Sequence, residues 1–236
     1  MPNTESENKE REARILDAAA DLIVRYGYDK TTMSDMADQA GVTRAIVYIH
    51  FPGKENLFEA LLFREVQKYN RAWLEAVESD PGAETIGAIF RSVLYAVDQS
   101  PFIAALLKRD RRVFGNYLRK PGNMFASIHT DALWVELLDR LQKAGAIRAD
   151  IQPPIFAHVM GALSSGLLAA QDNPAGDSPA LENTLETIAD MLDRTLIPQG
   201  NGDSTAAKAI IRQMARDALA RFGLPGQLDD ETRKPA

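Results

Sequence analysis

The sequence contains no cysteine among its 236 residues. This absence excludes disulfide bonds, thiolate nucleophiles and zinc sites with cysteine ligands, and it fits a reducing compartment. No stretch approaches the roughly 18 uninterrupted apolar residues that a membrane span needs. Residues 1–14 are polar and charged, without the apolar run of an export signal. We therefore expect a cytoplasmic protein without a membrane partner.

The sequence also lacks the short motifs that carry common enzyme chemistry. There is no Gly-x-Ser-x-Gly, no phosphate-binding Walker loop, no Gly-x-Gly-x-x-Gly and no Glu-x-x-His pair. The three histidines are isolated from one another along the chain, and the carboxylates are scattered. We predict that the protein is not an enzyme and that it holds no metal or cofactor.

Acidic residues outnumber basic ones in the whole sequence, but not in every segment. The net charge of −6 argues against a protein that coats nucleic acid through a broad basic surface. Between Asp38 and Glu55, however, no acidic residue occurs, and Arg44, His50 and Lys54 all fall within this gap. The local charge therefore allows a short DNA-reading segment.

The spacing of apolar residues predicts helices and no strands. Residues 1–8 are interpreted as a polar, mobile tail, and a helix from about Glu10 buries one stripe: Ile15, Leu16, Ala19, Leu22, Ile23 and Tyr26. Gly27 is placed as its C-terminal cap, and Thr32 with Asp35 resembles a capping box for the next helix. Further helices are expected at about 44–51, 54–79, 83–99, 102–119, 123–144, 154–171, 179–197 and 205–222, with a disordered tail after the last.

The expected fold is all-α, with a three-helix helix-turn-helix head joined by a long helix to a helical bundle for ligand binding and dimerisation. The long helix at 54–79 is long enough to connect two domains rigidly. We predict a DNA-binding domain at 9–56 and an effector-binding and dimerisation domain at 57–198. Residues 199–236 form a linker, an extra helix and the tail. The extra helix can cap the body, extend a dimer interface or swap between chains.

The helix at 44–51 has two distinct faces. Val47 and Phe51 are four residues apart and should pack on the two preceding helices. The opposite face then carries Ala45, Ile46 and Ile49, flanked by Arg44, Tyr48 and His50. Two isoleucines that face away from the local core are unexpected on a short helix unless another surface covers them. They either press on thymine methyl groups in the major groove, or are buried against the long helix or a partner chain.

The DNA hypothesis assigns a role to each polar neighbour. Arg44 can bind guanine through two parallel hydrogen bonds. Phosphates would be held by Thr32, Thr43, Tyr48, His50 and Lys54, together with backbone N–H groups at the helix N-termini.

The segment from Ile15 to Leu57 resembles the head of the TetR (tetracycline-repressor-like) family. The family's Tyr-x-His-Phe-x-x-Lys-Glu-x-Leu motif is present from Tyr48 to Leu57. The resemblance implies base contacts from Thr43, Arg44, Ala45, Ile46 and Ile49, with Thr32, Tyr48, His50 and Lys54 near phosphates. Ile46 and Ile49 depart from the small polar and aromatic residues common at these positions, so the operator sequence cannot be taken from relatives.

The middle of the chain is rich in aromatic residues and predicts a small-molecule pocket. The expected lining residues are Phe90, Tyr95, Phe114, Tyr117, Phe125, His129 and Trp134. The effector is then small and apolar or aromatic. It can also be anionic if the basic run at 108–112 contributes, although this run also suits a solvated face, and His129 also suits an ordinary core or surface position.

The resemblance further implies that the helices at 154–171 and 179–197 form a four-helix bundle with their twins. The expected interface residues are Gly161, Ser165, Leu168, Leu185, Ile188 and Leu192. The alternative is that this seam packs within one chain. We predict a ligand-responsive regulator, most simply a repressor, that binds palindromic double-stranded operator DNA as a homodimer and is released by its effector. The alternative is a helical interaction or scaffold protein without DNA binding.

Overall fold

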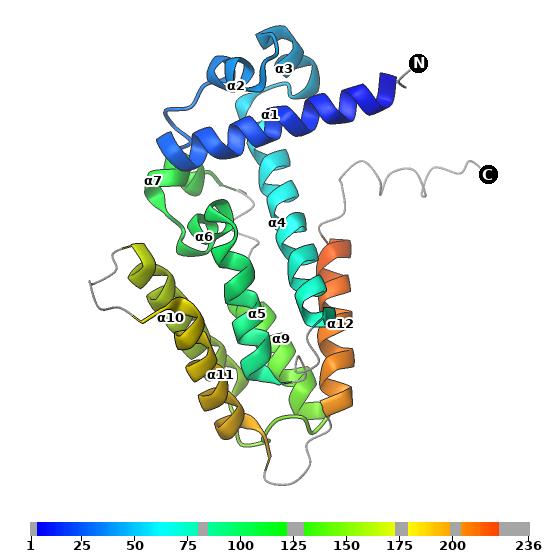
Figure 1. Cartoon of the computed structure of the whole chain (residues 1–236), viewed down its shortest axis with the longest axis vertical. Coiled ribbons are helices and arrows are strands. Elements are labelled where there is room, and N and C mark those ends of the chain that lie inside the picture. The colour runs from blue at the N-terminus through cyan, green and yellow to red at the C-terminus, as the bar shows by residue number, and fades with distance from the viewer. Residues whose placement is uncertain (1–3, 80–84, 122–129, 173–178, 199–203, 222–236) are drawn as a thin grey trace, which may run out of the picture. The chain divides into compact units, whose positions relative to one another are not determined.

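A computed structural model describes residues 4–79, 85–121, 130–172, 179–198 and 204–221. Within these ranges every regular element is a helix and no strand occurs, which confirms the predicted all-α class (Figure 1). The elements are α1 (Thr4–Tyr26), α2 (Met33–Ala40), α3 (Arg44–His50), α4 (Lys54–Ser79), α5 (Ile86–Asp98), α6 (Pro101–Lys108), α7 (Arg111–Phe114), the 3-10 helix η1 (Gly115–Arg119), α9 (Thr130–Lys143), α10 (Pro153–Asp172), α11 (Leu181–Leu196) and α12 (Ser204–Arg221).

The chain forms two compact units. The first contains residues 1–65 and 101–128, and the second contains 66–100 and 129–236. Helix α4 therefore belongs to both, with residues 54–65 in the first unit and 66–79 in the second. The functional domains expected at 9–56 and 57–198 stay a prediction.

Helix α1 begins earlier than the sequence suggested. Residues 4–8, expected in a mobile tail, are helical. Two local interactions favour this: Glu5 and Glu7 lie in the first turn, where the helix dipole favours negative charge, and Lys9 pairs with Glu5 at 3.0 Å. The predicted stripe is buried from Ile15 to Ile23, but the expectation for Tyr26 was wrong, because its side chain is 59% exposed.

The single helix predicted at 102–119 is instead three short ones. Helix α6 ends at Lys108, Arg109 has a positive φ of 48°, and Asp110 caps α7 by accepting a hydrogen bond from the Arg112 N–H at 2.7 Å. The short acidic side chain gives the backbone a local partner that competes with continuation of the helix.

An aromatic cluster forms the core of the first unit where α4 meets the segment 102–117. Its members are Tyr28, Phe58, Phe102, Phe114 and Tyr117, with neighbouring ring centroids 4.5 to 6.2 Å apart. The Tyr28 N–H also donates to the Val113 carbonyl at 2.7 Å. The turn after α1 is thereby held against α7 by both ring packing and a backbone bond.

The second unit has its own apolar core. Helix α5 packs on α11 and α9 packs on α10, around buried residues that include Phe90, Leu138 and Met160. Helix α12, whose role the sequence left open, lies on α9 of its own chain and buries Ala207 and Ile211. It also reaches the end of α4, where Arg216 lies 3.8 Å from Glu78 (Figure 1).

Gly27 allows the close approach of α1 to α7, and this gives a stability prediction. Its φ is +88°, and a Cβ there would lie 2.5 Å from the Arg112 carbonyl oxygen. Gly41 has a similar φ of +64°, but a Cβ added to it would meet no described atom within 4 Å. In urea unfolding we expect Gly27→Ala to lose about 2 kcal/mol more than Gly41→Ala, since both pay backbone strain but only the first also overpacks. If the two variants lost equal unfolding free energy, the close approach of α1 to α7 at Gly27 would be contradicted.

Candidate nucleic-acid interface

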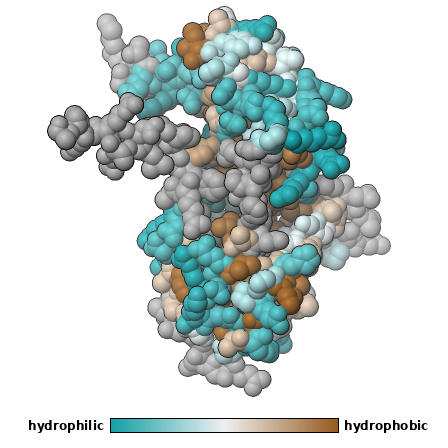
Figure 2. Space-filling model, turned by 180° about the vertical axis from the view of Figure 1, so that it is seen from behind, coloured by the Kyte–Doolittle hydropathy of each residue, from teal (hydrophilic) through white to brown (hydrophobic). Residues whose placement is uncertain are grey.

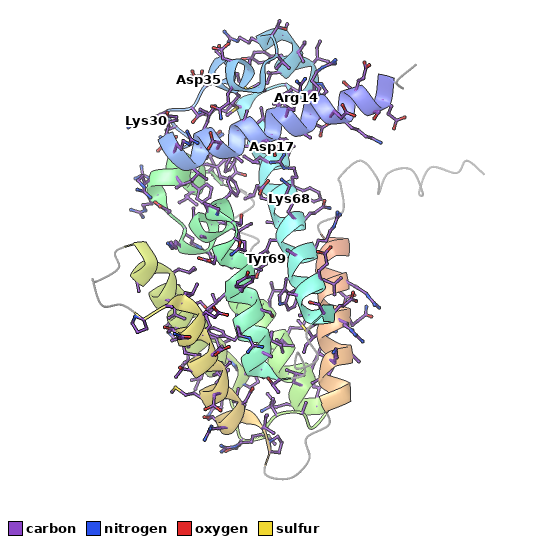
Figure 3. The ribbon with its side chains drawn as sticks, viewed as in Figure 1. Arg14, Asp17, Lys30, Asp35, Lys68 and Tyr69 are labelled. Carbon is purple, nitrogen blue, oxygen red and sulfur yellow. The ribbon has the colours of Figure 1, made fainter. Side chains whose placement is uncertain are left out.

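Helix α2 begins with a complete capping box, as the sequence predicted. The Asp35 N–H donates to Thr32 Oγ1 at 3.2 Å, and the Thr32 N–H donates to Asp35 Oδ2 at 2.8 Å. The Thr32 hydroxyl also donates to Asp35 Oδ2. These bonds favour the ionised carboxylate, so the Thr32 side chain, and after it the Thr32 backbone, holds the pKa of Asp35 below its ordinary value (Figure 3).

The turn between α2 and α3 is set by Gly41. This residue is left-handed, and the Val42 N–H donates to the Ala37 carbonyl at 3.0 Å, which satisfies the end of α2. Thr43 then caps α3, because its hydroxyl accepts a hydrogen bond from the Ile46 N–H at 3.4 Å. Two capped helices joined by a tight turn form a helix-turn-helix unit.

Helix α3 is anchored from one side. Val47 is completely buried and Phe51 is 5% exposed, which confirms the predicted inward face. On the outward side, Arg44 and Ala45 are exposed and Ile49 is 79% exposed, while Ile46 is partly buried. The space-filling view shows a hydrophobic patch over α3 at this end of the first unit (Figure 2). The monomer therefore does not cover this apolar surface.

Arg44 is held by its neighbour one turn along the helix. Its guanidinium donates to the Tyr48 hydroxyl at 3.3 Å and lies 5.4 Å from the centre of the Tyr48 ring. The hydrogen bond to Tyr48 raises the pKa of Arg44 above its ordinary value. The charged group is thus pre-positioned at the exposed edge of α3.

His50 and Lys54, two of the expected phosphate contacts, turn toward their own chain. The His50 side chain is 6% exposed, with Nδ1 4.0 Å from a carboxylate oxygen of Glu12. The Lys54 ammonium lies 4.2 Å from the centre of the Tyr28 ring, and burial lowers its pKa. Thr32, Thr43 and Tyr48 are exposed. Phosphate contacts from all five residues stay predictions.

The residues predicted for a ligand pocket fall into both units. Phe90 and Trp134 meet in the second unit, with ring centroids 6.3 Å apart. Phe114 and Tyr117 belong to the aromatic cluster of the first unit, and Tyr95 is 59% exposed. Phe125 and His129 lie outside the described residues. A surface hollow in the second unit, at the C-terminal ends of α9 and α11, is lined by none of these residues.

Of the residues predicted for the dimer interface, some are buried within the single chain and others are exposed. Leu168 on α10 is 3% exposed within the single chain. Leu185 on α11 is 1% exposed, and Ile188 and Leu192 pack partly against the same core, so the seam of α11 faces α5 of its own chain. Gly161 is partly exposed and Ser165 is exposed.

The apolar residues that α10 and α11 expose are not those predicted for the dimer interface. Ile155, Val159 and Met191 are 60%, 51% and 61% exposed. The sequence reasoning missed them because it favoured the small residues of α10. The four-residue spacing of Ile155 and Val159 was the available signal.

The capped turn and the outward face of α3 define the class: a helix-turn-helix DNA-binding regulator. Comparisons with known proteins agree. The family model for "Bacterial regulatory proteins, tetR family" matches residues 15–61. The HTH-type transcriptional repressor Rv1474c of Mycobacterium tuberculosis is 27% identical over 186 residues, which cover 79% of this chain and 92% of that protein. The regulator TtgR of Pseudomonas putida is 31% identical over 96 residues, 41% of this chain and 45% of TtgR.

Solved structures show the same fold. A TetR-family transcriptional regulator from Rhodococcus sp. aligns with a TM-score of 0.57 at 22% identity, over 78% of this chain and 99% of that one. FadR of Bacillus subtilis, solved in complex with stearoyl-CoA, aligns with a TM-score of 0.57 at 18% identity, over 77% and 97%. Residues 15–61 match the tetR family of bacterial transcriptional regulators, and the chain as a whole is similar to members of that family in sequence and fold. Its relatives are named as regulators and not as enzymes.

The capping box gives a prediction for acid titration. A lowered pKa means that ionised Asp35 stabilises the folded state above its ordinary value near 3.8, and that this stabilisation is lost as the pH falls through the lowered value. In an NMR titration, Thr32→Ala should raise the pKa of Asp35, because the hydroxyl makes the largest contribution. Thr43→Ala, which removes the cap of α3, should leave it unchanged. An unaltered Asp35 titration in Thr32→Ala would contradict the capping geometry.

Proposed function

We propose that the protein is a ligand-responsive repressor that binds a palindromic operator as a homodimer and is released by a small-molecule effector. One observation supports the proposal that α3 binds DNA: the helix buries Val47 and exposes Arg44, Ala45 and Ile49. The surface combines one fixed cation with apolar groups, which suits the edges of guanine and of thymine in the major groove. Such a protein acts in the cytoplasm, where its operator lies.

The base contacts follow from this surface. Arg44 donates to guanine O6 and N7, while Ala45, Ile46 and Ile49 contact thymine methyl groups. Thr43, at the N-terminus of α3, also reaches the bases. Thr32 and Tyr48 can bind phosphates in the conformations that the structure shows. Lys54 must first move away from the Tyr28 ring, and His50 can offer only the small part of its side chain that is exposed.

Substitutions on α3 test this assignment. In anisotropy titrations with the promoter of its own gene, Arg44→Ala should raise the Kd about 10- to 100-fold, because a bidentate arginine–guanine contact is lost. Ile49→Ala should weaken binding less and relax the preference for thymine. Lys143→Ala, which removes an exposed charge from α9, serves as the control and should change the Kd less than about twofold. Equal affinity of Arg44→Ala and wild type would refute the assigned face.

The exposed face of α10 supports the homodimer. Ile155, Val159, Ala162, Gly166 and Ala169 all lie on one side of this helix and are all exposed. By length and composition alone, α10 is apolar enough to span a membrane, and only 17% of that window is buried inside the chain. A second copy related by twofold symmetry covers such a face, since its small residues let two helices approach closely. Two heads then read two half-sites of one operator.

A charge placed in this face should separate the two copies. In sedimentation velocity, we expect Val159→Asp to shift the protein from dimer to monomer, because an unpaired carboxylate is costly inside an apolar interface. Operator affinity should fall with it. Ala209→Asp puts the same charge on an exposed position of α12 and should leave the dimer intact. A Val159→Asp variant that stays dimeric would place the interface elsewhere.

The effector site is proposed for the second unit. Its apolar core holds Phe90 and Trp134, which suits a small apolar or aromatic molecule. Stearoyl-CoA is bound by the Bacillus subtilis FadR structure, and a γ-butyrolactone receptor also shares the fold, with a TM-score of 0.55 at 22% identity. The protein is released from DNA if the effector binds more tightly to a dimer conformation that does not fit the operator. A coupling free energy of about 1–3 kcal/mol between effector binding and DNA binding is typical of such systems.

A further inference from the structure

Asn70 interrupts the buried stripe of helix α4. The stripe contains Leu62, Val66 and Val77, which are 0%, 8% and 0% exposed. At about 100° per residue, position 70 lies within roughly 40° of both Val66 and Val77 on the helix wheel. Asn70 is itself only 7% exposed. An amide is thus buried at a position where the sequence pattern calls for an apolar side chain.

Only two polar residues are buried in the described part of the chain, and they differ in their hydrogen bonds. Thr31, in the first unit, donates its hydroxyl hydrogen to the Gly27 carbonyl at 2.9 Å. The amide nitrogen of Asn70 has no hydrogen-bond partner among the described residues. A buried donor without a partner destabilises the folded state, because it has lost its bonds to water and gained none.

The polar groups near Asn70 along α4 do not supply a partner. Trp73, one turn further along, donates its indole N–H to Ser92 Oγ at 3.1 Å, and Ser92 donates to the Ile89 carbonyl at 2.8 Å. Lys68 is exposed, and Tyr69 leaves the helix on another side (Figure 3). Burial raises the pKa of the Tyr69 phenol above its ordinary value, which is typical of surroundings with little water.

We propose that Asn70 is a specificity-determining residue of the effector site, where its amide nitrogen donates to a neutral hydrogen-bond acceptor such as a ketone, ester or lactone carbonyl. This inference rests on the proposed effector response. A neutral acceptor is favoured over a carboxylate because no lysine or arginine of the described second unit belongs to the buried residues, although Arg212 on α12 buries its Nε. An ionised group without a counter-charge is far more costly to bury than a carbonyl.

The first test needs no ligand. Asn70→Leu keeps a similar size and removes the unpaired amide, so the midpoint of thermal unfolding should rise by a few degrees, about 2–4 °C for each kcal/mol in a chain of this size. Thr31→Val is the matched control, because it removes a buried hydroxyl that does have a partner, and its midpoint should fall. A lower midpoint for Asn70→Leu would overturn the proposal, since the amide would then have a structural role.

The second test measures binding of three ten-carbon probes: γ-decalactone, 2-decanone and decanoate. The wild type should bind the lactone or the ketone and should bind decanoate more weakly. Asn70→Leu should weaken binding of the neutral probe about tenfold, as expected for one lost hydrogen bond. Asn70→Ala should show the same loss and covers the case in which leucine does not fit. Absence of binding by both neutral probes, stronger binding of decanoate, or unchanged affinity in the variants would each refute the assignment.

Binding to DNA separates this proposal from the proposed function. Asn70→Leu should bind the promoter as tightly as the wild type, but the neutral probe should release it only at about tenfold higher concentration. If the wild type does not bind the promoter at low salt, the proposed repressor function fails, whereas the probe titrations still decide the role of Asn70. If the probe releases both proteins equally, the role of Asn70 fails and the repressor remains.

Discussion

The burial of Val47 fixes which side of α3 faces outward, and the DNA-binding surface depends on this rotation. Helix α3 has seven residues, too few to be stable alone in water. Its geometry therefore comes from three supports: the Thr43 cap, the left-handed turn at Gly41 and the packing of Val47 with Phe51. Only with these in place does the Arg44–Tyr48 pair stand at an exposed edge, with Ile49 beside it.

The same first unit is held together by contacts between distant parts of the sequence. The turn at Gly27 and Tyr28 meets Arg112 and Val113 through a close backbone approach, and the aromatic cluster continues the contact into α4 at Phe58. Because interiors are closely packed, the position of the turn at Gly27 and Tyr28 depends on the segment that holds Arg112 and Val113. The first unit is thus held together by residues that lie far apart in the sequence.

Local signals made the head predictable from the sequence. Thr32, Asp35, Gly41 and Thr43 each act within four residues, so their caps and turns could be assigned before any fold was known. The break at Asp110 was missed because an aspartate within a basic run also suits the exposed face of a continuous helix.

The features that the sequence could not predict depend on tertiary packing, that is, on which distant residue each side chain contacts. Leu185 belongs to a regular apolar seam that fits either α5 or a twin helix, and periodicity alone does not distinguish them. Tyr26 has the spacing of a buried residue, but its side chain is 59% exposed at the last position of α1. The aromatic residues of the middle segment gave no sign that Phe114 and Tyr117 pack with the head, because their partner Phe58 is more than fifty residues away in the sequence.

Ile49 and Asn70 break the ordinary rule of burial in opposite directions. Ile49 exposes a large apolar side chain, and Asn70 buries an amide without a partner. Each is unfavourable in the isolated chain, and we propose that each gains a complementary partner: thymine methyl groups for Ile49 and a neutral carbonyl for Asn70. Sequences that are otherwise locally consistent tolerate such violations where function requires them. The two sites lie on consecutive helices of the chain, Ile49 on α3 and Asn70 on α4.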